Sequence, residues 1–278
     1  MITIFSIPKP FKGHIGIIQR NAIQSWSRLG PNCEIILFGD EEGTASTAAE
    51  LGIKHVPDVE RNEFGTPLLK NMFERAQLLA SNDIICYVNA DIILMNDFIK
   101  AVKRVALRKQ KFLMVGQRWN LDIEKQIDFN KCWEDDLRKL VHENGVLFTV
   151  YGIDYFVFPR GQYDNFPPFA VGRPSWDNWM IYNAHLRGIP VIDATKVVLC
   201  VHQNHDYLHL KDINNRMGGG PEANMNMSLA NDADHVYSLM DSNYTLTKHF
   251  AINNRLIDLS NKCKFVAYVA IKNLKNEI

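Results

Sequence analysis

The sequence lacks several features that mark other classes of protein. Lys and Arg together number 31 among its 278 residues, and so do Asp and Glu, so no excess positive charge favours nucleic-acid binding. Its five cysteines are scattered and form no CxxC pair, which favours reduced thiols over a disulfide framework or a zinc cluster. The glycine-rich signatures of dinucleotide sites and P-loops, GxGxxG and GxxxxGK[ST], are also missing.

Long apolar runs are absent too. No stretch approaches the length that crosses a bilayer, and Met1 leads directly into a strand pattern rather than a basic and apolar leader. These observations predict a cytoplasmic protein. The segment 254–278 has helical character and interleaves lysines with apolar residues. Packing of this helix against the core and peripheral contact with a membrane surface both stay open as interpretations.

Strands and helices alternate along the first sixty residues. Apolar strand patterns at 2–6, 34–38 and 53–56 are separated by helical patterns at 14–29 and 47–51. This order predicts an α/β protein with a mostly parallel, doubly wound sheet flanked by helices. Further helices are expected at 68–79, 97–108, 132–144 and 175–187, and further strands at 84–94, 112–116, 152–161, 191–193 and 197–201.

The run Ile84–Leu94 is the most informative stretch. It reads as a strand buried on both faces, interrupted by Asn89, Ala90 and Asp91. At the carboxyl end of a parallel strand, Asp91 would face the crevice where open α/β sheets bind ligands. A hard divalent cation bridging to phosphate oxygens is a suitable partner for this carboxylate, and a simple strand-end turn is the structural alternative.

Histidines follow the strand that ends near Val201. His202 or His205 could lie beside Asp91, and an imidazole with a carboxylate suits Mn²⁺ or Mg²⁺ when phosphate oxygens fill the remaining positions. Alternatively His202, His205, Asp206 and His209 form a metal cluster of their own.

Two aspartates are candidates for acid–base work. Asp177 opens a helix within Trp176-Asp177-Asn178-Trp179, where it either caps the helix or takes a proton from an attacking hydroxyl. Trp176 and Trp179 would then stack on a sugar. Asp154, at the start of a strand that alternates with one polar face, either binds a polar ligand or satisfies backbone groups.

A nucleotide would lie against the loops after the first two strands of a doubly wound sheet. The candidates are Ser6, Pro8 and Lys9 after the first strand and Asp40 after the second. Lys70, on the helix before the central strand, is a further candidate for a phosphate contact.

Together these residues resemble a GT-A glycosyltransferase of the kind found in bacterial and viral surface-glycan clusters. The resemblance covers about residues 1–225 and rests on the Asn-Ala-Asp triplet with two longer runs, Gly172–Trp179 and Val201–Tyr207 followed by Gly220-Pro221-Glu222. It implies that Asp91 binds the metal holding the donor diphosphate, with His202 or His205 as second ligand. It further implies that Asp40 contacts the base, most simply uracil, that Asp177 is the acceptor-side carboxylate, and that Arg173 belongs to the acceptor site.

The resemblance also implies a domain organisation. Residues 1–116 would bind the nucleotide-sugar and 117–225 the glycan acceptor, with 226–278 as a C-terminal helical extension. Three alternatives stay open: a metal-dependent hydrolase using His202, His205 and Asp206, a non-catalytic glycan-binding protein on the same scaffold, and a sugar nucleotidyltransferase. A nucleotidyltransferase needs a Gly-rich, Arg-containing loop after the first strand to bind a triphosphate, and this sequence has no such loop there. Asn89, in place of the usual acidic residue, keeps the glycan-binding reading open.

Overall fold

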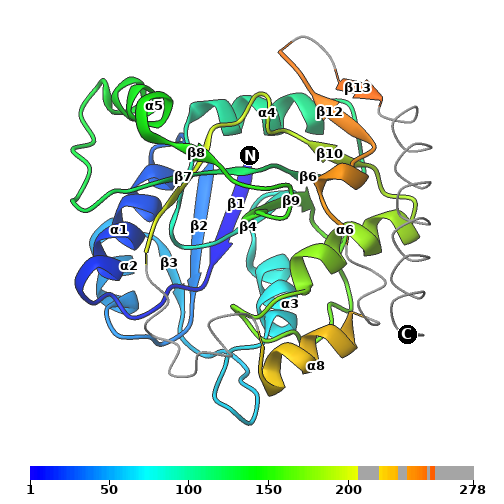
Figure 1. Ribbon diagram of the computed structural model, residues 1–278. Helices are drawn as coiled ribbons and strands as arrows, with labels where there is room; N and C mark the ends of the chain where they lie inside the picture. Colours follow the sequence, from blue (N-terminus) through cyan, green and yellow to red (C-terminus); the bar gives the residue numbers. More distant parts are fainter. Residues whose placement is uncertain (206–218, 231–236, 249–250, 254–278) are drawn as a thin grey trace, which may run out of the picture.

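A nine-stranded mixed sheet forms the centre of the protein. The computed structural model describes residues 1–205, 219–230, 237–248 and 251–253. The strands of the main sheet lie in the order β13-β12-β10-β6-β9-β4-β1-β2-β3 (Figure 1). Their bounds are β1 Ile2–Ser6, β2 Cys33–Phe38, β3 Lys54–Val56, β4 Ile84–Val88, β6 Leu113–Val115, β9 Tyr155–Pro159, β10 Val191–Asp193, β12 Tyr244–Leu246 and β13 Ala251–Asn253.

The first half of this sheet is parallel, as the sequence predicts. β1 pairs in parallel with both β2 and β4, and β2 pairs in parallel with β3. β9 then runs antiparallel to β4 and β6, while β10 and β12 continue in parallel from β6. β9 is buried along Tyr155–Phe158, so the expectation of a strand with one polar face was wrong. Its place between two other strands, under helices on both sides, explains the burial.

A second sheet of four strands was not foreseen. β5 (Ile92–Ile93), β11 (Cys200–Gln203), β7 (Arg118–Leu121) and β8 (Val146–Leu147) lie in that order. The apolar run at 84–94 therefore divides between two sheets: β4 ends at Val88, and β5 pairs antiparallel with β11. The three residues between them, Asn89 to Asp91, form the turn from one sheet to the other.

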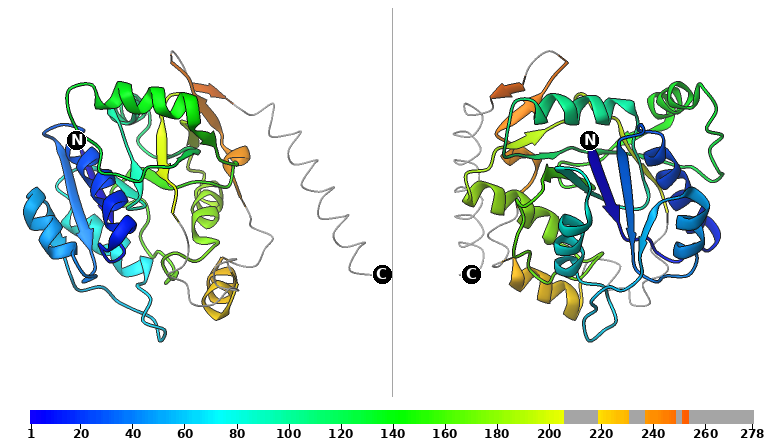
Figure 2. Two further views of the ribbon diagram at one scale, coloured as in Figure 1. Left: turned by 60° about the vertical axis from the view of Figure 1, so that its left-hand side comes forward. Right: turned by 180° about the vertical axis from the view of Figure 1, so that it is seen from behind.

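Helices cover both faces of the main sheet (Figures 1 and 2). One buried cluster joins the sheet to side chains of α1, α2 and α4, and another joins its opposite face to α3 and α6. The α/β class is thereby confirmed. The helices are α1 Gly13–Ser27, α2 Thr44–Leu51, α3 Leu69–Leu79, α4 Asn96–Ala106, α5 Trp133–Asn144, α6 Trp176–Leu186 and α8 Pro221–Leu229, with a 3₁₀ turn at Leu239–Asp241.

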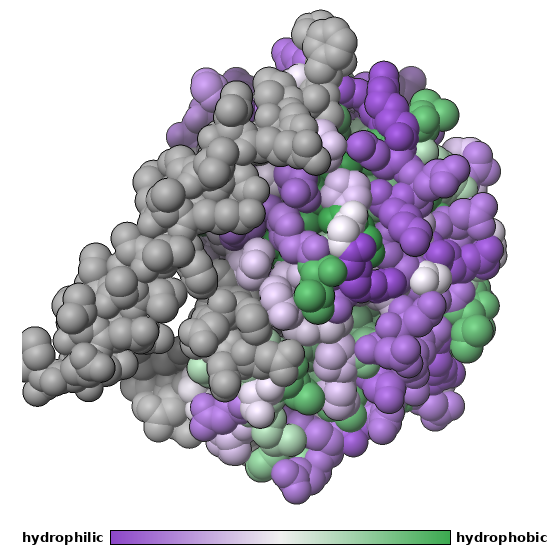
Figure 3. Space-filling view, turned by 90° about the vertical axis from the view of Figure 1, so that its right-hand side faces the viewer, coloured by the Kyte–Doolittle hydropathy of each residue, from purple (hydrophilic) through white to green (hydrophobic). Residues whose placement is uncertain are grey.

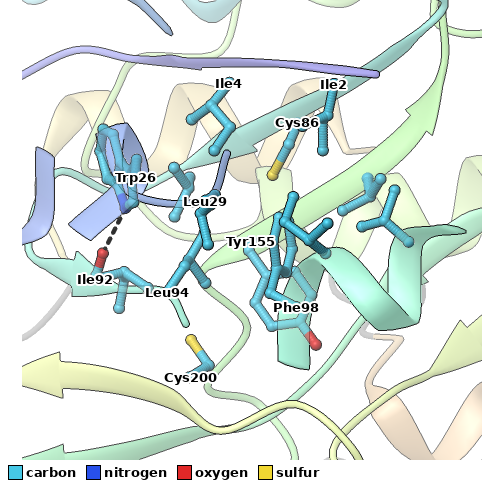
Figure 4. Close-up of a cluster of buried hydrophobic side chains, with 14 of the residues drawn as sticks. Ile2, Ile4, Trp26, Leu29, Cys86, Ile92, Leu94, Phe98, Tyr155 and Cys200 are labelled. Atoms are coloured by element: carbon cyan, nitrogen blue, oxygen red, sulfur yellow. Dashed lines mark hydrogen bonds between the residues drawn. The ribbon is translucent and has the colours of Figure 1, made fainter. Parts of the chain in front are cut away.

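The turn at 89–91 is fixed by packing beneath it. Trp26 of α1 is fully buried and its Nε1 donates a hydrogen bond of 2.8 Å to the carbonyl oxygen of Ile92 (Figure 4). Leu94 and Cys200 lie in the same cluster as strand residues of the main sheet such as Cys86. Because interiors are close-packed, this shared core fixes the small sheet relative to the large one.

The segment after residue 225 does not form helix alone. The predicted boundary falls inside α8, and β12 and β13 beyond it extend the edge of the main sheet. The predicted helix at 254–278, with its suggested membrane contact, lies outside the described residues. Among the residues that are described, no helix has the length and apolar character to cross a membrane. On the face shown in Figure 3, the described surface is mainly hydrophilic, and its hydrophobic residues form small separate groups.

Candidate active site

Asp91, His202 and His205 meet at the junction of the two sheets. The pairing of Ile92 with His202 brings β11 alongside the turn that carries Asp91. The Oδ2 atom of Asp91 lies 3.1 Å from Nε2 of His205 and 3.8 Å from Nε2 of His202. One ligand atom from each of the three residues can be chosen so that all lie within 4.8 Å of one another. The sequence left His202 and His205 as alternatives, whereas the structure brings both to Asp91.

This cluster fits a divalent cation. Oδ1 of Asp91 and Nδ1 of His202 are buried and have no hydrogen-bond partner in the described structure. Buried polar atoms without a partner are rare and call for an explanation such as a bound ion. One carboxylate and two imidazoles suit Mn²⁺ and leave positions for phosphate oxygens and water.

The surroundings of Asp91 and His202 favour the protonation states that bind metal. Burial by itself would raise the pKa of the Asp91 carboxyl, but the hydrogen bond with His205 and the nearby charge of Lys9 oppose it, and that pKa lies well below its usual value. Burial lowers the pKa of His202, and nearby Arg118 lowers it further, against the opposing effect of Asp91. An ionised carboxylate and a neutral imidazole are the forms that bind metal.

A hydrogen-bonded carboxylate lies next to the cluster. Asp154 is buried and accepts two bonds from Nη1 of Arg118, 3.1 Å to Oδ1 and 2.9 Å to Oδ2. Nδ2 of Asn89 donates to the same Oδ1 at 2.6 Å. The Arg118 guanidinium also donates from Nε to Oδ1 of Asn120 at 3.1 Å. A buried carboxylate with charged and amide donors is held in a fixed orientation.

Asp177 has a different environment. It is the second residue of α6 and lies half-buried, with the backbone N–H of Asn178 donating to its Oδ1 at 3.0 Å. Burial raises the pKa of Asp177 to about 6, and the charge of Asp154 adds to the effect. A carboxyl group with a pKa in this range can exchange protons near neutral pH, as a general base must.

These groups line one cleft of about 590 Å³. The cleft runs from the loop after β1 across the turn at 89–91 to the start of α6. Its polar and charged lining residues are Lys9, Gln19, Glu41, Thr66, Asn89, Asp91, Arg118, Asp154, Arg173, Asp177, His202 and His205. The candidate metal cluster, the hydrogen-bonded carboxylate of Asp154 and the Asp177 carboxyl with its raised pKa therefore lie in one solvent-accessible cleft.

The structure brings part of the predicted nucleotide set to this cleft. Pro8, Lys9, Asn89, Ala90 and Asp91 line it. The loop that carries Lys9 is held by Gln19, whose side chain accepts from the Lys9 N–H at 2.6 Å and donates to its carbonyl at 2.8 Å. These two hydrogen bonds fix the wall of the cleft beside Asp91.

Three predicted nucleotide contacts lie elsewhere. Ser6 is buried, and its Oγ donates to the carbonyl oxygen of Val88 at 2.6 Å, which joins β1 to the end of β4. Asp40 pairs with Arg61 at 2.6 Å and borders a separate pocket of about 270 Å³. The Arg61 hydrogen bond lowers the pKa of Asp40. Lys70 is exposed at the second residue of α3 and is not part of the cleft lining.

The two tryptophans of the acceptor set are mainly core residues. Trp176 is 6% exposed, and its ring lies 5.0 Å from that of Phe156. Trp179 is 7% exposed and packs against Phe166, with ring centroids 5.1 Å apart. Trp176 still borders the cleft, whereas Trp179 does not.

Arg173 also borders the cleft on this side. It forms an ion pair with Glu222 that the sequence did not suggest. Its Nε donates to Oε2 of Glu222 at 3.0 Å, and Asn62 donates to the other carboxylate oxygen at 2.8 Å. Glu222 is the second residue of α8. The three residues thus join the loop after β3, the loop before α6 and α8 at the rim of the cleft.

Sequence reasoning also missed Arg118, Glu41 and Gln19. All three line the cleft, but none belongs to a motif. Arg118 lies in a short strand whose pairing partners are distant in sequence. The only signal in the sequence for a site residue here is a charged side chain next to an apolar pattern. Asp206 and His209, the other members of the alternative metal cluster, lie outside the described residues.

No protein-family model and no curated protein matches this sequence. Solved structures do resemble it. Glucosyl-3-phosphoglycerate synthase from Mycobacterium tuberculosis, in complex with Mn²⁺, UDP and phosphoglyceric acid, is 15% identical with a TM-score of 0.48, over 84% of this chain and 79% of that one. Mannosyltransferase PcManGT from Pyrobaculum calidifontis, with GDP-Man and Mn²⁺, is 13% identical with a TM-score of 0.47, over 74% of this chain and 57% of that one. TarS from S. aureus (residues 1–349) is 9% identical with a TM-score of 0.43, over 74% of this chain and 58% of that one.

Proposed function

We propose that this protein is a metal-dependent glycosyltransferase. It would move a sugar from a nucleotide-diphosphate sugar, with a UDP-sugar as the first expectation, to a hydroxyl of a glycan or related acceptor. The observation that carries the proposal is the cluster of Asp91, His202 and His205 within one cleft with Asp154 and Asp177. Both the donor half, residues 1–116, and the acceptor half, 117–225, contribute to that cleft.

The donor would bind at the carboxyl ends of β1 and β4. Asp91, His202 and His205 would hold Mn²⁺ or Mg²⁺, which when bound neutralises charge on the leaving diphosphate. Pro8 and Lys9 form the adjoining wall, where the lysine adds a positive charge beside the diphosphate. Open α/β sheets bind nucleotides at this edge.

The acceptor hydroxyl would approach from the side of α6. Asp177 accepts its proton as the hydroxyl oxygen forms a bond to the anomeric carbon of the donor sugar. The bond from that carbon to the diphosphate oxygen breaks, and the electron pair leaves with the nucleoside diphosphate. The pKa of about 6 leaves Asp177 ionised at neutral pH and still able to accept a proton.

Asp154 and Arg118 would position the donor sugar. Asp154 is fixed by Arg118 and Asn89, so its oxygens keep one orientation as hydrogen-bond acceptors for sugar hydroxyls. A preoriented acceptor of this kind lowers the entropy cost of aligning the substrate.

Calorimetric titration of UDP, GDP and CDP, each with and without Mn²⁺, tests the donor site. We expect one nucleotide to bind only with Mn²⁺ and that binding to disappear in Asp91→Asn. Asp135→Asn is a matched control, because Asp135 is exposed on α5 and outside the cleft.

Each outcome of this titration has a distinct meaning. Binding of Mn²⁺ without any nucleotide would overturn the transferase proposal in favour of a metal-dependent hydrolase. Binding of a nucleotide and its sugar derivative, with no turnover of the donor by transfer or hydrolysis, would favour a non-catalytic glycan-binding protein.

A further inference from the structure

The small sheet has two faces of different character. Trp119, Leu121 and Val201 point to one face and pack with α5 residues such as Trp133 and Leu137. Residues that alternate with them along the strands point to the other face. That second face carries His202 of the metal cluster and Arg118, both of which line the cleft.

A continuous row crosses this second face. Asn120 of β7 pairs with His202 of β11 on one side and with Val146 of β8 on the other. Directly paired residues of neighbouring strands project to the same face. His202, Asn120 and Val146 therefore lie in one row, and Val146 is about 10 Å from His202, two strand spacings away.

The far end of the row is apolar and open to solvent. Val146 is 65% exposed and Phe148 is 36% exposed. Phe148 extends the same strand beside Arg118: its N–H donates to the Arg118 carbonyl at 2.9 Å, and the guanidinium lies 4.5 Å from its ring centre. We call Val146 and Phe148 the apolar shelf.

The shelf is held in place rather than left loose. Gln117 donates from its side-chain amide to the Phe148 carbonyl at 2.6 Å. A Cβ at Gly152 would lie 2.3 Å from the Phe148 ring, so only glycine allows the ring its position there. Phe148 thus lies against Arg118, which lines the cleft, and an exposed apolar surface fixed beside a polar site can contribute to ligand binding.

We propose that the apolar shelf binds an alkyl group of the acceptor, attached next to the sugar whose hydroxyl reacts. The inference rests on the proposed function and adds the class of acceptor, an amphipathic glycoside. Burial of hydrocarbon against Val146 and Phe148 removes apolar surface from water on both sides. The Arg118 guanidinium already covers one face of the Phe148 ring, which leaves the shelf suited to an aliphatic group rather than to stacking of a sugar ring.

Binding of octyl β-glucoside, below its micelle concentration, and of methyl β-glucoside tests the proposal. Both are titrated calorimetrically into the full chain with Mn²⁺ and the nucleotide that binds. We expect the octyl compound to bind at least about tenfold more tightly than the methyl compound, since each buried methylene contributes to affinity.

The chain offers a matched pair of variants. Val146→Asn should remove most of the octyl preference, whereas Leu147→Asn should keep it. Leu147 is 41% exposed but pairs with Trp119, on the opposite face of the strand. A milder variant, Val146→Thr, should give an intermediate preference with little change in size or fold.

Three results would overturn the inference: equal binding of the two glucosides, equal loss of the octyl preference in Val146→Asn and Leu147→Asn, or self-association of the wild type that Val146→Asn abolishes. The last would show that the shelf joins two copies of this chain. Nucleotide binding is measured separately in the same samples. Its failure alone would reject the transferase proposal, and its success with equal glucoside binding would reject only the acceptor class.

Discussion

The side-chain amide of Asn89 donates to the carboxylate of Asp154 at 2.6 Å. Asn89 stands where the resemblance expects an acidic residue, and this bond gives a physical reason. A carboxylate at position 89 would lie against the buried carboxylate of Asp154, and two like charges at that distance cannot both stay ionised at low cost. The amide supplies a donor instead, alongside Arg118.

Asn89→Asp should therefore destabilise the fold in a pH-dependent way. The pair of carboxyl groups would have a raised pKa in the folded state, so stability is retained at low pH and lost as pH rises through that value. We expect a loss of about 1–3 kcal/mol at pH 8 and a smaller one at pH 5, measured by urea unfolding at both pH values. Asn89→Ala removes the bond without adding charge, and its effect should be nearly independent of pH.

Removal of Arg118 should be costly through Asp154. Arg118→Met leaves a buried carboxylate with one amide donor, for which we expect a loss of about 3–5 kcal/mol in unfolding free energy. The double variant Arg118→Met with Asp154→Asn should recover part of that loss, because no buried charge is left unpaired. Additive effects in the double variant would show that the two side chains are not energetically coupled.

Asp177 should determine the acidic limb of the activity profile. As a base with a pKa of about 6, it gives a kcat/KM that falls as pH drops below that value. Asp177→Asn should reduce turnover by at least about 100-fold while nucleotide affinity stays the same. Donor turnover between pH 4.5 and 8 measures both effects, and turnover retained in the variant would remove Asp177 from the base role.

The same substitution should stabilise the fold. The pKa of Asp177 is higher in the folded state than in the unfolded chain. The stability that the Asp177 carboxyl contributes is therefore fully present below the pKa of the unfolded chain and is lost as pH rises through about 6. Asp177→Asn should thus increase the free energy of unfolding at pH 7.5 by about 1–2 kcal/mol and raise the melting temperature there. At pH 4 both should be nearly unchanged. The melting temperature of the variant minus that of the wild type is measured at both pH values. A larger difference at pH 4 than at pH 7.5 would contradict a buried charge at Asp177.

Divalent metal should stabilise the protein through Asp91, His202 and His205. A ligand at 100 times its dissociation constant adds about 2.7 kcal/mol to the unfolding free energy. We expect Mn²⁺ to raise the melting temperature and EDTA to reverse the shift. His205→Asn should abolish most of it, whereas His142→Asn, an exposed change on α5, should not.

The sequence by itself determined the local features of this protein. A continuous apolar run ending in Asn89, Ala90 and Asp91 identified the strand end that carries the site, because a buried strand leaves a distinct pattern. The helix that begins near Asp177 and the parallel first half of the sheet follow from local periodicity and element order in the same way. These properties depend on neighbours a few residues away, so a single chain reveals them.

Only the tertiary structure decided which distant residues meet. The antiparallel pairing of β5 with β11 brings Asp91 to His202 and His205 across more than a hundred residues, and nothing in either local pattern encodes that register. The same holds for Arg118 with Asp154 and for Asp40, which pairs with Arg61 outside the cleft. Trp176 and Trp179 look like sugar platforms in the sequence but are buried, because exposure depends on what the rest of the chain packs against them.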